Sequence, residues 1–246
     1  MALAMYSMRL TWSFLLMLSA VATHAGEADQ AAMASLWSEV DAQVYQLRAE
    51  LGFDRLSPAV RDALQAVPRD QFIPTESRHL AYENRPISIG FGQTISQPLI
   101  VAAMTELLNV EPGQRVFELG TGSAYQAAVL ATIGVDVYTV EIIPPLAERA
   151  RQTLDRLGFD NVQTRVGDGY FGWTEAAPFD AIIVTAANDH VPLPLLQQLK
   201  PGGRMVIPVG SRYSTQKLVL ITRDENGMTR TREILPVTFV PLTGER

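Results

Sequence analysis

The segment that most constrains the fold spans residues 115–126 and reads RVFELGTGSAYQ. An apolar run is broken there by a glycine-rich turn, and a second apolar run, DVYTVE, ends at Glu141. Gly120 and Gly122 allow the backbone to turn tightly and to approach a ligand closely. A carboxylate at the tip of the next strand can accept hydrogen bonds from two ribose hydroxyls. The pattern therefore predicts an α/β protein that holds the sugar of a nucleotide-like cofactor.

The spacing of this loop separates two classes of cofactor. A dinucleotide-binding loop, G-x-G-x-x-G, needs its third glycine at position 125, where this chain has Tyr125. The pattern E-x-G-x-G-x-G/A suits a ligand with an ammonium and a sulfonium group but no phosphate, and Glu118 is expected to face that cationic end. We therefore predict S-adenosyl-L-methionine as the cofactor, although such a loop alone also fits an ordinary strand-to-helix turn.

Composition limits the classes of function that remain. Hydrophobic residues make up 47% of the 246 residues and charged residues 19%, which is enough apolar material for a folded core. A formal net charge of −6 gives no basic surface for nucleic acid or anionic lipid. The chain has no cysteine, and its histidines, His24, His79 and His190, lie far apart. We therefore predict no metal site, no disulfide and an organic cofactor.

The first 25 residues differ from the rest of the chain. They carry one charge, Arg9, followed by the 13-residue apolar run LTWSFLLMLSAVA and the small residues Thr23 and Ala25. This order is typical of a secretory signal peptide, and the run is short for a membrane span. We predict cleavage after Ala25, export to the periplasm and no membrane attachment of the mature form. An uncleaved anchor and an unused upstream start before Met33, which would leave a cytoplasmic protein, are the alternatives.

Residues 26–246 are predicted to form a single domain with helices first and a sheet after them. Apolar residues recur at helical spacing over 28–51, Ser57 and Pro58 are typical of a helix start, and Pro98 is expected to open another helix. From 115 onward, apolar runs at 116–119, 135–140, 162–166, 181–185 and 205–209 alternate with helical stretches near 123–133, 144–157 and 193–199. This alternation predicts a doubly wound, mostly parallel sheet with helices on both faces.

The end of the chain departs from this alternation. Runs at 217–223 and 234–242 are strand-like, and Asn226-Gly227 between them is a hairpin turn signal. We therefore expect a C-terminal antiparallel hairpin at one edge of the sheet, with Pro236 and Pro241 at strand ends or on the edge strand.

Together these segments resemble the protein-L-isoaspartate (D-aspartate) O-methyltransferases, over nearly the whole of residues 26–246. The resemblance is carried by AVPRDQFIP at 66–74, YENRPISIGFGQTISQP at 82–98, the loop at 118–126, GDGY at 167–170, PFDAIIVTAA at 178–187 and LKPGGRMVIPVG at 199–210. GQTISQP is the most specific of these. The resemblance implies a seven-stranded methyltransferase fold, residues 26–114 bearing the substrate loop, 115–246 binding S-adenosyl-L-methionine, and isoaspartyl or D-aspartyl proteins as acceptors.

The resemblance also assigns roles to residues. It places Ser96 at the active site, with Gln93 and Thr94 in the same loop, and Ser96 contacting the substrate. An isoaspartyl α-carboxylate is ionised at neutral pH and needs no general base, so a hydroxyl that orients it suits the chemistry. Without the family, Ser96 could equally be a helix N-cap before Gln97 and Pro98.

The cofactor residues predicted from the loop and the resemblance form one larger set. They are Glu118, Gly120, Thr121, Gly122, Ser123, Glu141, Asp168 and Gly169. Asp168 is expected beside the adenine amino group, although Asp-Gly sequences are also common in plain turns.

Two positions depart from the family pattern. Ala124 stands where the third glycine of the loop is usual, and alanine at a helix start is expected to weaken cofactor binding modestly or not at all. Asn188-Asp189-His190 replaces the usual proline-rich turn, and His190 is a candidate substrate contact.

Two alternative functions stay open: a carboxyl methyltransferase with another acceptor, and a catalytically weak cofactor-binding relative. The protein is expected to be a monomer.

Overall fold

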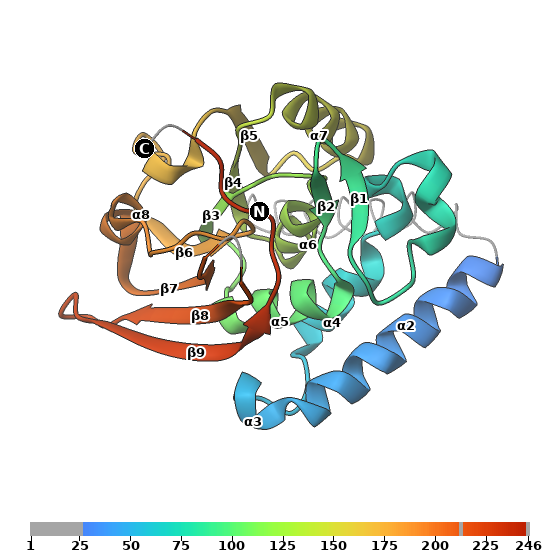
Figure 1. Ribbon diagram of the computed structural model, residues 1–246, viewed down its shortest axis with the longest axis horizontal. Helices are drawn as coiled ribbons and strands as arrows, with labels where there is room; N and C mark the ends of the chain where they lie inside the picture. Colours follow the sequence, from blue (N-terminus) through green and yellow to red (C-terminus); the bar gives the residue numbers. More distant parts are fainter. Residues whose placement is uncertain (1–26, 212–213, 245–246) are drawn as a thin grey trace, which may run out of the picture.

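The computed structural model describes residues 27–211 and 214–244, so the predicted signal peptide lies outside the described part of the chain. Its main element is a seven-stranded sheet of order β5-β4-β3-β6-β7-β8-β9 (Figure 1). The strands are β3 (Arg115–Leu119), β4 (Asp136–Glu141), β5 (Val162–Val166), β6 (Phe179–Val184), β7 (Leu199–Val209), β8 (Gln216–Arg223) and β9 (Thr229–Val237). The first five are parallel, and β8 runs antiparallel to both β7 and β9. The predicted fold class is confirmed.

The central strands are buried on both faces, which explains their continuous apolar runs. Along β3 and β6, Val116 and Ala181 belong to one core cluster, whereas Phe117 and Ile182 belong to the other. Because successive side chains of a strand point to opposite faces, each strand contributes to both cores.

Helices cover the two faces unequally. The α-helices are α2 (Glu27–Gln46), α3 (Arg48–Leu51), α4 (Pro58–Ala66), α5 (Pro98–Leu108), α6 (Tyr125–Ile133), α7 (Pro144–Leu157) and α8 (Leu193–Gln198). The 3₁₀ turns are η1 (Arg69–Phe72), η2 (Thr75–Leu80) and η3 (Gly169–Phe171). In Figure 1 α2, α4 and α6 lie to one side of the central strands and α8 to the other. The residues of α2 to α7 share one hydrophobic core with the sheet.

The N-terminal helices begin where the sequence predicts. Ser57 accepts a hydrogen bond from the amide of Val60 at 3.4 Å and starts α4 with Pro58. Pro98 is the first residue of α5. Both helices therefore use proline where a missing amide hydrogen costs nothing.

A short antiparallel hairpin, β1 (Ile87–Gly90) and β2 (Gln93–Ile95), forms a second sheet that we did not predict. Its two-residue turn has positive φ at Phe91 (54°) and Gly92 (71°). Such turns are usually signalled by Asn-Gly, and this chain has Phe91-Gly92 instead, so the local sequence does not predict the hairpin. A hydrogen bond from Arg149 to the carbonyl oxygen of Ile89 fixes β1 to α7.

The C-terminal hairpin forms, but the predicted bounds of its second strand, 234–242, are wrong. β9 occupies Thr229–Val237, and its first five residues are exposed. An edge strand can pair through its backbone without burying side chains, so the polar run TRTRE gave no strand signal. Residues 238–244 leave the sheet and cross the ends of other strands.

Strand order reverses between β3 and β6, because β4 and β5 follow β3 on one side and β7 follows β6 on the other. Open α/β sheets bind ligands in the crevice at such a point, outside the carboxyl ends of the strands. In residues 27–211 and 214–244 no helix is long and apolar enough to cross a membrane.

Candidate cofactor and substrate site

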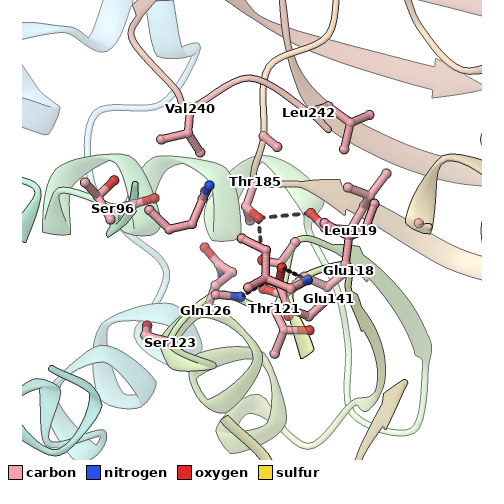
Figure 2. Close-up of a pocket in the computed structure, with 18 of the residues that line it drawn as sticks. Ser96, Glu118, Leu119, Thr121, Ser123, Gln126, Glu141, Thr185, Val240 and Leu242 are labelled. Carbon is pink, nitrogen blue, oxygen red and sulfur yellow. Dashed lines mark hydrogen bonds between the residues drawn. The ribbon is translucent and has the colours of Figure 1, made fainter. Parts of the chain in front are cut away.

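A cavity of about 760 Å³, counted with the space at its open mouth, lies at the carboxyl ends of β3, β4 and β6. Its walls are formed by four parts of the chain: the loop before α5, the glycine loop after β3 (residues 118–126), the end of β4, and the C-terminal segment (residues 240–243). Among the predicted site residues, the cavity is lined by Gln93, Thr94, Ser96, Glu118, Gly120, Thr121, Gly122, Ser123, Glu141 and Gly169. Figure 2 shows Val240 and Leu242 on the side opposite Ser123 and Gln126.

The glycine loop after β3 is fixed by hydrogen bonds to β4 and to the residue that follows β6. Thr185 donates a hydrogen bond to the carbonyl oxygen of Gly120 at 2.6 Å, and the Gly120 amide donates to Val140 at 2.9 Å. Gly120 has φ of 98°, and a Cβ there would collide with the Thr185 hydroxyl. Only glycine combines a left-handed backbone with the absence of a Cβ at this position.

Ala124 also has a left-handed backbone, with φ of 70°, at the N-cap of α6. Ala124 therefore precedes the helical backbone and is not an ordinary residue of the first turn. The expected effect on cofactor binding, a modest weakening or none, stays a prediction. A left-handed conformation costs a non-glycine residue ~1–2 kcal/mol. The buried methyl group packs in the main core and offsets part of this cost.

Glu141 is held by the backbone of two loops. Its Oε2 accepts from the amide of Gly122 at 2.8 Å, and its Oε1 accepts from the amide of Ile143 at 3.0 Å. The carboxylate therefore ties the tip of β4 to the glycine loop. Each oxygen keeps a further lone pair for a ribose hydroxyl.

Glu118 is completely buried and lines the same cavity. Its Oε2 accepts a hydrogen bond from Thr139 at 2.6 Å, whereas its Oε1 has no hydrogen-bond partner among the described residues. Burial, reinforced by the nearby charge of Glu141, raises the pKa of Glu118 to about 8, although the Thr139 hydroxyl opposes the shift. A buried oxygen without a donor marks the place where a ligand donor or cation fits.

Ser96 lies at the other side of the cavity, between β2 and α5. The predicted alternative role as helix cap is not observed, since the N-cap residue is Gln97 and makes no side-chain cap. The amide of Leu99 instead donates to the side-chain oxygen of Asn84 at 3.1 Å. The Ser96 hydroxyl is therefore not used to start the helix.

Arg69, in η1, lies behind this loop with only 1% of its surface exposed. Its Nη2 donates to the carbonyl oxygen of Ser96 at 2.7 Å, and its guanidinium lies 5.0 Å from the ring centre of Tyr125. Burial lowers the pKa of Arg69 to about 10, so the group stays charged at neutral pH. We did not predict this residue, although PRDQF was part of the family resemblance.

Asp168 is not among the residues that line the cavity. Its Oδ1 accepts from the amide of Tyr170 at 3.0 Å and caps η3, which is the turn role that a flanking glycine suggests. A contact with adenine stays a prediction. The neighbouring Gly169 packs too closely on Leu119 to admit a side chain.

His190 also lies outside the cavity lining. Its Nδ1 is 2.5 Å from Asp189 Oδ1 and its Nε2 is 2.9 Å from the hydroxyl of Tyr170. About half of the His190 side chain is exposed, so a large acceptor can reach it. Its role in substrate binding stays a prediction.

The C-terminal segment supplies cavity residues that we did not predict, Val240, Pro241, Leu242 and Thr243. It is attached to the turn after β6 through hydrogen bonds from Ala187 to Val240 at 2.8 Å and from Leu242 to Ala187 at 2.7 Å. The apolar run at 234–242 contained a signal for these contacts, but we interpreted all of it as strand.

Comparison with known proteins identifies the family. The family model Protein-L-isoaspartate(D-aspartate) O-methyltransferase (PCMT) matches residues 42–246. The chain belongs to the PCMT family. The predicted family, methyltransferase activity and role in protein repair are thereby confirmed.

Two PCMT relatives have more than half of their aligned residues in common with this chain. Protein-L-isoaspartate O-methyltransferase 2 of Polaromonas sp. is 56% identical over 86% of this chain and 100% of its own length. The enzyme of the same name from Syntrophobacter fumaroxidans is 56% identical, over 87% of each chain.

A PCMT crystal structure from Plasmodium falciparum superimposes with a TM-score of 0.68 and is 27% identical, covering 82% of this chain and 97% of that one. It is a complex with S-adenosyl-L-homocysteine. At the level of the PCMT family, this confirms the predicted cofactor. Within the described residues, no group of three His, Cys, Asp or Glu side chains could hold a metal ion.

Proposed function

We propose that this PCMT-family protein transfers the methyl group of S-adenosyl-L-methionine to the free carboxylate of L-isoaspartyl residues in damaged proteins. One observation carries the proposal: a single cavity has the carboxylates of Glu118 and Glu141 on its cofactor side and the loop of Ser96 on its acceptor side. The two reactants can therefore meet in one cavity.

The cofactor side is built for a cationic nucleoside without phosphate. Glu141 is oriented for the ribose, the glycine loop lets the backbone approach, and the unpartnered Oε1 of Glu118 suits the positive end. S-adenosyl-L-methionine, when bound there, supplies an electrophilic methyl group on a sulfonium.

The acceptor side needs to orient a nucleophile and does not need to deprotonate it. Carboxylates are ionised at neutral pH, so Ser96 has only to donate a hydrogen bond that aims one oxygen. Gln93 and Thr94 complete the same wall. The C-terminal segment from Val240 to Thr243 lines another side of the cavity.

The decisive experiment offers the purified protein labelled S-adenosyl-L-methionine and matched peptides with normal aspartyl, L-isoaspartyl or D-aspartyl residues. We expect methyl incorporation into the L-isoaspartyl peptide, and labelling of the D-aspartyl peptide would add that residue to the acceptors. Equal labelling of the normal peptide would replace the proposal by a broad carboxyl methyltransferase. Cofactor binding without transfer would favour the catalytically weak relative, a candidate that the strained backbone of Ala124 supports.

We further propose that the protein is exported. The support for export is the order of charge, apolar run and small residues in positions 1–25, which the structure does not describe. Cell fractionation followed by N-terminal sequencing tests it, with Gly26 expected as the first residue of a periplasmic form. A cytoplasmic protein that starts at Met1 or Met33 would contradict export.

A further inference from the structure

Two buried threonine hydroxyls connect the glycine loop to Glu118. The hydroxyls of Thr121 and Thr139 are 2.7 Å apart, and Thr139 donates to Glu118 Oε2 at 2.6 Å. Because the single hydroxyl hydrogen of Thr139 goes to Glu118, Thr121 must be the donor in the first bond. The hydrogen bonds therefore run in one direction, from the loop to the carboxylate.

Strand pairing creates this chain of hydrogen bonds. Glu118 on β3 and Thr139 on β4 are direct partners in the parallel register, and both are completely buried. A valine would match the buried surroundings of position 139 equally well in shape, but it lacks the hydroxyl donor that the threonine supplies there. Thr121 is 96% buried, so water does not compete for these bonds.

The arrangement occupies one oxygen of Glu118 and leaves the other without a partner. Oε1 is a buried acceptor with no hydrogen bond among residues 27–211 and 214–244, and Glu118 lines the cavity. Glu118 forms no salt bridge within that part of the chain, and the charged group that faces it, Glu141, is also an acid. The group that Oε1 is suited to bind is therefore a cation or a strong hydrogen-bond donor.

We propose that Thr139 and Thr121 are positioning residues that hold Glu118 with Oε1 turned into the cavity, where its charge receives the cationic methionine end of the cofactor. This inference rests on the proposed function for the identity of the cofactor. Thr139 acts through Glu118 and does not touch the ligand.

A coupling between cofactor binding and proton release follows. Burial raises the pKa of Glu118 to about 8, so the carboxyl carries a proton at pH 7 before the cofactor binds. A cation beside it favours the ionised form, and the displaced proton passes to the buffer. Cofactor affinity therefore increases from pH 6 toward pH 8 and levels off above it.

The test is calorimetric titration of the full protein with S-adenosyl-L-methionine in buffers of different ionisation enthalpy. We expect the unaltered protein to release close to one proton per bound cofactor at pH 7, and Glu118→Gln to release none. Thr139→Val should weaken binding at pH 7 by about tenfold, because a hydrogen bond to a charged group is lost. It should also move the rise in affinity to higher pH, since the hydroxyl favours ionised Glu118.

Thr139→Ser keeps the donor and should restore the affinity and the pH profile. Thr132→Val is the matched control, because the Thr132 hydroxyl donates to Ala128 within α6 at 2.8 Å and has no contact with Glu118. If Thr139→Val does not fold, Thr121→Val tests the same chain of hydrogen bonds. Unaltered affinity and pH profile in Thr139→Val, or equal loss in Thr139→Val and Thr139→Ser, would overturn the inference.

These results are separate from those of the peptide assay. Proton-linked binding without methyl transfer to an isoaspartyl peptide would leave the role of Thr139 in place and refute the proposed function. Transfer at normal rates by a protein whose cofactor binding is independent of Thr139 would refute the role of Thr139 and leave the proposed function in place.

Discussion

Arg69 holds the backbone of Ser96 from behind the cavity. Its Nη2 lies 2.7 Å from the Ser96 carbonyl oxygen, while its Nε and Nη1 have no hydrogen-bond partner among the described residues. A buried charge whose donors lack partners is costly, so Arg69 lowers the stability of the folded protein. The contact links the residue predicted to aim the acceptor to a charge outside the cavity lining.

Substituting Arg69→Met should therefore loosen the loop of Ser96 while the hydrogen bonds that hold Glu118 and Glu141 stay in place. We expect turnover on an isoaspartyl peptide to fall by roughly tenfold or more, because the hydrogen bonds from the charged Nη2 to the carbonyl oxygens of Ser96 and Arg85 are lost. The dissociation constant for S-adenosyl-L-methionine should stay within about twofold. Steady-state kinetics and calorimetry check this, and a weakened cofactor affinity with unchanged turnover would contradict it.

Ser96→Ala should slow methyl transfer by about 10- to 100-fold, the range for a hydrogen bond to a charged group, while the fold survives. The hydroxyl is not needed as a helix cap, because Asn84 supplies that contact to α5. Ser88→Ala, on the hairpin that precedes Ser96, is the control, because among the described residues its hydroxyl contacts only the amide of Gly90, from which it accepts at 3.4 Å. Unchanged turnover of Ser96→Ala on an isoaspartyl peptide would remove Ser96 from the active site.

Ala124→Gly and Ala128→Gly should change stability differently, although both alter buried alanines at α6. At position 124 glycine relieves a left-handed backbone worth ~1–2 kcal/mol, which offsets the lost methyl group and the added freedom of the unfolded chain. At position 128, inside the helix, glycine should cost about 1 kcal/mol. Denaturant unfolding measures both, and an equal loss in the two variants would show that position 124 carries no strain.

The cofactor-free protein should become less stable as pH rises from about 4.5 to about 8 through the titration of Glu118. Its pKa is raised to about 8 in the folded state from 4.5, so the folded chain binds more protons than the unfolded chain in this window. The free energy of unfolding then falls by up to ~1.4 kcal/mol per pH unit from this group and is constant above its folded pKa. Glu118→Gln should show a flatter profile in urea unfolding, and identical slopes would refute the buried titration.

His190→Ala should change the preference among isoaspartyl peptides, because the partly exposed imidazole lies where a large acceptor can reach it. The imidazole is held by Asp189 and Tyr170 at the carboxyl ends of the strands. His79→Ala is the control, because His79 is exposed on η2. The same selectivity in both variants would count against a substrate contact.

Local sequence patterns determined much of the architecture. The period of the apolar residues and the proline and serine at helix starts gave α4, α5 and the parallel strands, because these signals act over a few residues. Gly120 and Glu141 predicted a nucleotide-like cofactor for the same reason, since the strand, the turn and the next strand lie close together in the chain. Tyr125 and Glu118 then narrowed this prediction to S-adenosyl-L-methionine. The hairpin of Phe91 and the polar start of β9 escaped prediction because their local residues do not favour those structures.

The partners of the site residues were decided by tertiary structure. Arg69 meets Ser96, Thr139 meets Glu118, and Val240 reaches the cavity only because the sheet order brings distant segments to one crevice. The sequence determined by itself that a glycine loop and two acids would receive a cofactor. Burial then decided which oxygen of Glu118 stays unpartnered and whether Ala124 is strained, because both depend on neighbours that no local pattern specifies.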